Sequence, residues 1–122
     1  MARYVILLRS SHTDLAAMQA ALSRARNLLQ EGHQIAQVFF YGPSVLLANR
    51  LVVPGSNCPD FCSEWRSLAQ QYEIPLVACS SIGRSYGLVA EQQDNNIADG
   101  FTAGGLSEFI SLLAEVDHVE QH

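Results

Sequence analysis

Short apolar runs that alternate with longer stretches of helical spacing are the feature that most constrains how this chain folds. The runs RYVILLRS, QIAQVFFY and IPLVAC occupy residues 3–10, 34–41 and 74–79. Near-continuous aliphatic runs of this length are typical of strands buried on both faces, as in a parallel sheet. Because strands that alternate with helices build a sheet covered on both sides, we expect an α/β fold.

The stretch between the first two runs predicts a long helix. Its apolar residues recur every three or four positions, as in an amphipathic helix. We expect a serine or threonine among residues 11–13 to cap this helix and Gly32 to end it. His33, beside that glycine, suits a helix C-terminus, where an imidazolium meets the negative end of the dipole.

Three further stretches predict helices. A short helix is expected over residues 44–51, after the break at Gly42-Pro43, and longer ones over residues 60–73 and 106–116. The apolar positions that share one face are Phe61, Trp65, Leu68 and Tyr72 in the first of the longer helices, and Leu106, Phe109, Ile110 and Leu113 in the second.

The remaining segments are expected to be irregular or peripheral. Residues 80–89 are rich in turn formers, and residues 90–100 predict a polar surface stretch. The glycines of residues 100–109 are expected to let a loop turn and pack closely rather than to hold a phosphate. Residues 117–122 predict a short strand at the edge of the sheet.

The size and composition of the chain set the number of domains. The 122 residues, 48% hydrophobic and 16% charged, suffice for one globular core but not for two ordinary domains. We therefore expect residues 1–122 to form a single three-layer domain. Its central, mainly parallel β-sheet, with about five strands, is expected to be flanked by helices.

Charge and cysteine content restrict the surroundings in which the protein works. Seven basic and twelve acidic residues give a net charge of -5, which argues against direct binding of nucleic acid. The first apolar run ends at Arg9, far short of the ~20 residues of a membrane span. Three cysteines are too few for a disulfide framework and fit a reducing compartment. We expect a cytoplasmic protein with no membrane anchor.

Cys79 is the candidate catalytic residue, because it closes the third apolar run. Open α/β folds collect their sites at the carboxyl ends of strands, where this thiol is expected to lie. The following SSIG can turn backbone N–H groups toward the sulfur and favour thiolate, and Arg84 can add positive charge. The alternative also stands, since a cysteine that closes an apolar run is more often buried and inert.

The segment CSSIGR also suggests a cysteine-dependent phosphatase, in which a loop between a cysteine and an arginine wraps a phosphate. Only four residues separate Cys79 from Arg84, one fewer than such loops have. Bidentate recognition of phosphate tolerates little misplacement of the guanidinium, so this reading is the weaker one.

The other cysteines and the histidines do not assemble a recognisable motif. Cys58 and Cys62 form C-x3-C with a proline between them, which is neither the redox spacing nor half of a zinc site. We expect a loop thiol and a helix-face residue, with a switchable disulfide as the alternative. The four histidines are dispersed, although His12 can border the same rim as Cys79. No nucleotide motif is present, and we expect neither a metal nor a cofactor.

Several segments taken together resemble the DsrE/TusD family of sulfur-relay proteins over essentially the whole chain. They are RYVILL, EGHQIAQVFFYGPSVLLANRL, EWRSLAQQYEIPLVAC and GFTAGGLSEFISLLAEVDHV. The resemblance implies a DsrE-like α/β fold and a sulfurtransferase activity. The active cysteine of the family falls on Cys79, where it carries sulfur as a persulfide and passes it to a cysteine of a partner. No role is transferred to Cys58 or Cys62.

The resemblance also implies partners. Related small subunits, DsrF/TusC-like and DsrH/TusB-like, are expected in a hetero-oligomer, with a TusE/DsrC-like acceptor and an upstream donor such as a TusA-like protein. The pathway is either tRNA 2-thiouridine synthesis or dissimilatory sulfur oxidation. A chain made without its sister subunits is expected to be able to form a homo-oligomer. A structural subunit that carries no sulfur is the alternative function.

This chain departs from the family beside its cysteine. The family pattern C-x-A-A-A-x-R-R-G corresponds here to CSSIGRSYG, in which Gly87 keeps its place. Ser85 and Tyr86 stand in the arginine positions, and Arg84 comes one residue early. The positive charge expected near the sulfur is therefore reduced and moved.

Overall fold

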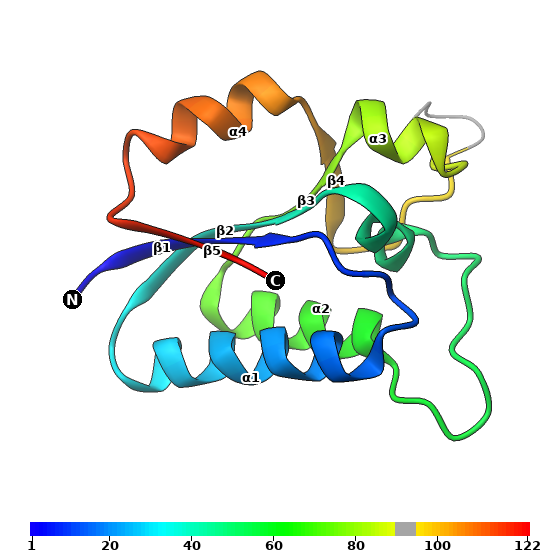
Figure 1. Ribbon diagram of the computed structural model, residues 1–122, viewed down its shortest axis with the longest axis horizontal. Helices are drawn as coiled ribbons and strands as arrows, with labels where there is room; N and C mark the ends of the chain where they lie inside the picture. The colour runs from blue at the N-terminus through cyan, green and yellow to red at the C-terminus, as the bar shows by residue number, and fades with distance from the viewer. Residues whose placement is uncertain (90–94) are drawn as a thin grey trace.

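A parallel sheet is the centre of the molecule. The computed structural model describes residues 1–89 and 95–122, and among these residues five strands form one sheet in the order β4-β3-β2-β1-β5 (Figure 1). All neighbouring strands pair in parallel, which confirms the predicted fold class. The strands are β1 (Arg3–Leu8), β2 (Gln34–Phe40), β3 (Leu76–Cys79), β4 (Phe101–Gly104) and β5 (His118–Gln121).

Helices cover both faces of the sheet and complete the three layers. Helices α1 (Leu15–Gln30) and α2 (Phe61–Tyr72) lie on one face, and α3 (Ser80–Ser85) and α4 (Leu106–Leu113) lie on the other (Figure 1). A 3-10 helix, η1 (Gly42–Ala48), follows β2. Helix α4 carries the chain from β4, at one edge of the sheet, to β5 at the other. None of the described helices is long and apolar enough to cross a membrane.

The ends of α1 differ in part from the prediction. Asp14, not one of residues 11–13, caps the helix, and its Oδ1 accepts a hydrogen bond of 3.1 Å from the backbone N of Ala17. Gly32 follows the helix with φ +88°, a conformation that glycine adopts without steric cost, so the predicted stop is confirmed. His33 is engaged elsewhere, since its Nδ1 accepts a hydrogen bond from the N of Ala2.

Two segments that were expected to be irregular are ordered elements. Residues 101–104, predicted as part of a glycine-rich loop, form strand β4 beside β3. Residues 80–85, predicted as turns, form helix α3. Of the predicted polar surface stretch, residues 90–94 lie outside the described residues. Asn96 and Ala98 are buried, and the N of Ala98 donates to the carbonyl of Ala48, so this part packs inward.

The two faces of the sheet bury separate apolar clusters. The larger cluster lies on the α1 and α2 side and includes Phe40 and Trp65. The smaller one, called here the Cys79 cluster, consists of Val5, Phe39, Cys79 and Phe109. Phe39 and Phe40 are fully buried on opposite faces of the sheet. On α4, Leu106 and Ile110 are 44% and 57% exposed. The buried face of this helix is therefore narrower than the sequence predicted.

The predicted edge strand near the C-terminus is confirmed as β5, and an ion pair fastens it to α1. Arg24 donates to both carboxylate oxygens of Glu120, the shortest contact being 2.7 Å. The Arg24 guanidinium holds the pKa of the Glu120 carboxyl below its ordinary value. The edge strand is therefore held by side chains as well as by its ladder with β1.

Candidate functional site

Cys79 lies where the sequence predicted it, at the carboxyl end of a strand. It is the last residue of β3 and directly precedes the first turn of α3. Its side chain is 1% exposed. The thiol is thus at the edge of the sheet where α/β folds place chemistry, but it is covered.

Aromatic packing against α4 provides much of that cover. The rings of Phe39, from β2, and Phe109, from α4, stack with centroids 4.2 Å apart and an interplanar angle of 16°. Both belong to the Cys79 cluster, and Tyr41 and Ile82 pack against that cluster at its margin. Ile82 comes from α3 and Tyr41 directly follows β2, so segments other than α4 also pack against the cluster that contains the sulfur.

A row of side chains crosses the carboxyl edge of the sheet beside Cys79. In the register, Leu8 pairs with Phe40 and Phe40 with Ala78, all on the α1 and α2 side. Successive residues of a strand point to opposite faces. The next row, on the α4 side, is therefore composed of Arg9, Tyr41 and Cys79.

Contacts within this row are specific. The Arg9 guanidinium carbon lies 5.7 Å from the centroid of the Tyr41 ring, which is cation–π distance, and that ring stacks on Phe39. The buried Ser44 hydroxyl bonds to the carbonyls of Leu8 and Tyr41 and so fixes the two strand ends together. Ser44 had no signal in the sequence beyond its place after a proline.

Arg84 lies at the other end of α3 from the thiol. It occupies the last turn of this six-residue helix, and its side chain is exposed. A helix rises about 1.5 Å per residue, so five residues carry Arg84 roughly 7 Å along the axis. Its charge there complements the C-terminal end of its own helix. Because residues 80–85 are helical, they do not form the open loop that a phosphatase reading requires.

The side of Cys79 that faces β4 is bordered by glycine. Cys79 pairs with Gly104 in the register. A Cβ at Gly104 would lie 2.6 Å from Cγ1 of Val77, closer than side chains tolerate. The glycine is thus required for β4 to pack beside β3, which is the close packing the sequence predicted, although in a strand rather than in a loop.

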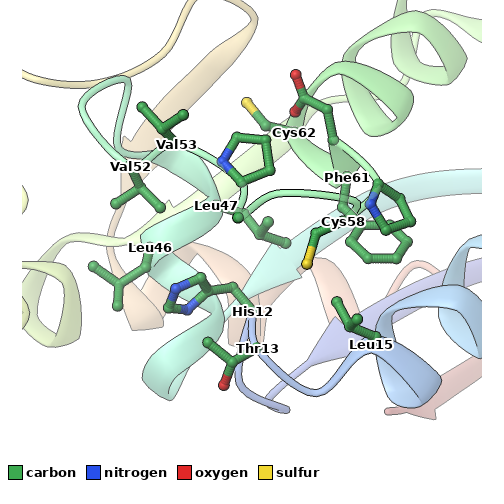
Figure 2. Close-up of a pocket in the computed structure, with 14 residues that line it drawn as sticks. His12, Thr13, Leu15, Leu46, Leu47, Val52, Val53, Cys58, Phe61 and Cys62 are labelled. Atoms are coloured by element: carbon green, nitrogen blue, oxygen red, sulfur yellow. The ribbon is translucent and has the colours of Figure 1, made fainter.

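A separate cavity of about 270 Å³ lies on the α1 and α2 side of the same edge. It is bounded by the start of α1, by η1 and by the loop and first turn of α2 (Figure 2). Most of its walls are apolar, and the polar side chains include His12 and Cys58. Cys79 is not among the lining residues, so the structure does not bring His12 and Cys79 into one site. We call it the Cys58 cavity.

The two thiols of the C-x3-C motif have different surroundings. The Cys58 sulfur points toward the space between His12 and Leu15, whereas the Cys62 sulfur points the other way (Figure 2). Both thiols are free and half-buried. Burial raises the pKa of the Cys62 thiol and the nearby Asp60 carboxylate raises it further, while Arg66 lowers it. They are a loop thiol and a helix residue, as predicted.

The described residues assemble no metal site. Among them, no group of three or more histidine, cysteine, aspartate or glutamate side chains is placed to hold an ion. The chemistry that Cys79 itself offers is that of a soft nucleophile, which attacks other sulfur atoms when it is ionised and accessible.

Comparison with known proteins identifies the family. The profile of the DsrE/DsrF-like family matches residues 2–119. The chain is 36% identical over 125 aligned positions to the sulfurtransferase TusD of Proteus mirabilis (strain HI4320), which covers 97% of this chain and 96% of that one. It is 34% identical over 122 positions to a sulfurtransferase TusD homolog of Pasteurella multocida (strain Pm70), covering 96% and 97%. The chain belongs to the DsrE/DsrF-like family.

Solved structures show the same fold. The ychN protein from E. coli superposes with a TM-score of 0.81 at 17% identity, over 100% of both chains. The protein of unknown function MTH1491 from Methanobacterium thermoautotrophicum superposes with a TM-score of 0.75 at 18% identity, over 98% and 99% of the chains. The DsrE-like fold that the sequence predicted is therefore confirmed.

Proposed function

We propose that this protein is a sulfurtransferase subunit of a sulfur relay, which carries sulfur as a persulfide on Cys79. The observation that carries the proposal is the position of Cys79. It ends β3 at the carboxyl edge of the sheet, in a chain whose relatives are named sulfurtransferase TusD. A relay role is the part that the names of the relatives support most directly.

The transfer is an exchange between sulfur atoms. The Cys79 thiolate attacks the outer sulfur of a donor persulfide, R–S–SH, forming Cys79–S–SH and releasing R–S⁻. One sulfur–sulfur bond forms and one breaks, the proton stays on the transferred sulfur, and no external oxidant is needed. A partner thiolate then attacks the same outer sulfur and restores the Cys79 thiolate. Each step requires that the attacking sulfur can reach the outer sulfur of the persulfide, so access limits the rate of transfer.

Because Cys79 is buried, a local movement of the chain must expose its sulfur before another sulfur atom can reach it. A sulfur that is 1% exposed cannot be attacked until part of its cover, to which Tyr41, Ile82 and α4 contribute, moves. We propose that a bound partner stabilises this open state, and that the partners are DsrF/TusC-like and DsrH/TusB-like subunits, a TusA-like donor and a TusE/DsrC-like acceptor. Arg84, the thiolate stabiliser that the sequence indicated, lies at the end of α3 away from the sulfur, so we assign it a lesser share of the charge near Cys79.

Mass spectrometry of the loaded protein tests the carrier role. We expect a Cys58→Ser/Cys62→Ser double variant, incubated with glutathione persulfide, to gain one sulfur of about 32 Da and to lose it to an added thiol. The single variant Cys79→Ser is the matched control, because it keeps both of the more exposed thiols. Peptide mapping must place the added sulfur on Cys79.

The alternative, a structural subunit, predicts a different outcome. In that case the double variant gains no sulfur, and Cys79→Ser still assembles with sister subunits and leaves sulfur flow through the complex unchanged. Equal loading of the native chain and of Cys79→Ser would also overturn the proposal, since the sulfur would then reside on the half-buried thiols.

A further inference from the structure

The exposed arginine that lies in the same row as the thiol directly follows β1 and does not come from α3. Arg9 is the residue after Leu8, and the hydrogen bonding between the two chain segments extends to Tyr41, whose N donates to the carbonyl of Leu8 at 3.0 Å. Neighbouring strands are about 4.8 Å apart. Two strand spacings therefore separate the backbones of Arg9 and Cys79, and Tyr41, which follows the strand between them, packs against the Cys79 cluster.

We propose that Arg9 and Tyr41 complete the Cys79 site, with Tyr41 as the movable cover of the sulfur and Arg9 as its source of positive charge. This inference rests on the proposed function, since it concerns the same sulfur. The Tyr41 ring is held from below by stacking on Phe39 and carries the Arg9 guanidinium above, 5.7 Å from its centroid. A displacement of the Tyr41 ring therefore also removes the surface on which the Arg9 guanidinium lies.

The state of the Arg9 side chain fits this role. It is exposed, and among the described residues no carboxylate lies within ion-pair distance of its guanidinium. A cation whose charge is not neutralised nearby acts on the anions that form beside it. In this site those anions are the attacking thiolate and the thiolate that leaves. An anionic donor persulfide is drawn to the same charge.

Other charged groups face the site from the remaining elements. Arg84 comes from α3 but lies at the far end of that helix. Glu108 lies in the first turn of α4. Its Oε2 is 3.8 Å from the point where a Cβ would lie if Gly104, the residue paired with Cys79, had one. The charge that the sulfur experiences is therefore set by Arg9 on one side and opposed by Glu108 on the other.

The net effect of these charges on Cys79 can be measured with two alkylating reagents of similar size but different charge. Iodoacetate is an anion and iodoacetamide is neutral, so the ratio of their rates with Cys79 reports the local potential and cancels the effect of burial. The measurement uses the Cys58→Ser/Cys62→Ser chain at low salt. We expect Arg9→Gln to lower the iodoacetate-to-iodoacetamide ratio about threefold, and about 1 M salt to remove the difference.

Matched variants separate Arg9 from its competitors. Arg84→Gln is expected to leave the ratio almost unchanged, and Glu108→Gln is expected to raise it. Tyr41→Ala should accelerate both reagents and lower the ratio, because the cover and the platform of Arg9 are lost together, whereas Tyr41→Phe retains both. A ratio that responds to Arg84→Gln and not to Arg9→Gln overturns the inference.

The experiment keeps this inference distinct from the proposed function. If Cys79 is too well covered to react, the same ratio is measured after Ile82→Ala, which thins the wall contributed by α3. Failure of Cys79 to react faster in Tyr41→Ala, in either background, overturns the cover role of Tyr41. If the double variant takes up sulfur on Cys79 but Arg9→Gln leaves the ratio unchanged, only this inference fails. If no sulfur is taken up, the proposed function fails whatever the ratio shows.

Discussion

The carboxyl edge of the sheet carries two thiol-bearing regions that are opposite in character. On the α4 side, Cys79 is packed between stacked aromatic rings and is 1% exposed. On the α1 and α2 side, the Cys58 sulfur faces an open cavity of about 270 Å³ (Figure 2). Exposure alone would select Cys58, whereas the position at the carboxyl end of a strand selects Cys79.

The contrast bears on how a persulfide on Cys79, as we propose it, would keep its sulfur. A persulfide that is accessible at all times also exchanges with any small thiol it meets. A thiol that is covered except during partner binding keeps its cargo between encounters. The packing of the Cys79 cluster thus supports the carrier role, provided that the cover is much less stable than the fold as a whole.

Phe109 provides the strongest test of that packing. Phe109→Ala removes one of the two stacked rings over the Cys79 cluster, and we expect a loss of about 3–4 kcal/mol in the free energy of unfolding. Ile110→Ala, one residue along and 57% exposed, is the control and should change stability by less than about 0.5 kcal/mol. Denaturation in urea measures both. Similar values for the two variants would show that α4 does not seal this face.

The reactivity of the three thiols tests the contrast directly. We expect iodoacetamide to modify Cys79 in the native chain about a hundredfold more slowly than Cys58 or Cys62, because Cys79 reacts only from a locally open state. Time-resolved peptide mapping measures the three rates separately. In denaturant the rates should converge. A Cys79 rate equal to the others under native conditions would remove the contrast between the regions.

Gly104 tests how tightly β4 closes the site. Gly104→Ala puts a Cβ within 2.6 Å of Val77 Cγ1, so the strand must shift, and we expect a loss of about 2 kcal/mol. Gly105→Ala is the matched control, since the nearest atom to its Cβ, Ser107 Oγ, is 3.8 Å away. Thermal unfolding distinguishes the two variants. A neutral Gly104→Ala would indicate that the edge beside Cys79 is loose.

Much of this architecture follows from local sequence. The aliphatic runs determine β1, β2 and β3, because a continuous apolar strand has to be buried on both faces. Strand β4 was missed because its residues, Phe101–Gly104, are few and glycine-rich, and their strand conformation depends on pairing with β3. Helix α3 was missed for a similar reason, since its six residues are turn formers that gain order by packing on η1 and the sheet.

The candidate site, too, could be predicted from the sequence only in part. The strand-end position of Cys79 was predicted from the chain itself, since it depends only on where an apolar run stops. Its burial and its alignment with Arg9 and Tyr41 depend on sheet order and register, which bring together residues far apart in sequence. No local pattern near Cys79 indicates that Arg9, which follows β1, lies in the same row.

The smallest expected effect concerns the pKa of Cys62, which lines the Cys58 cavity together with Asp60. The Asp60 carboxylate raises the pKa of the Cys62 thiol, so Asp60→Asn should lower that pKa and increase the thiolate fraction near neutral pH. Asparagine also caps helices, so its side-chain oxygen can still accept the hydrogen bond that the N of Ser63 donates to Asp60 Oδ1. We expect Cys62 to be alkylated about twice as fast at pH 7, with no change at Cys79. The gain should vanish above the Cys62 pKa, where the thiol is already ionised; a gain that persists there would indicate altered access instead of altered charge.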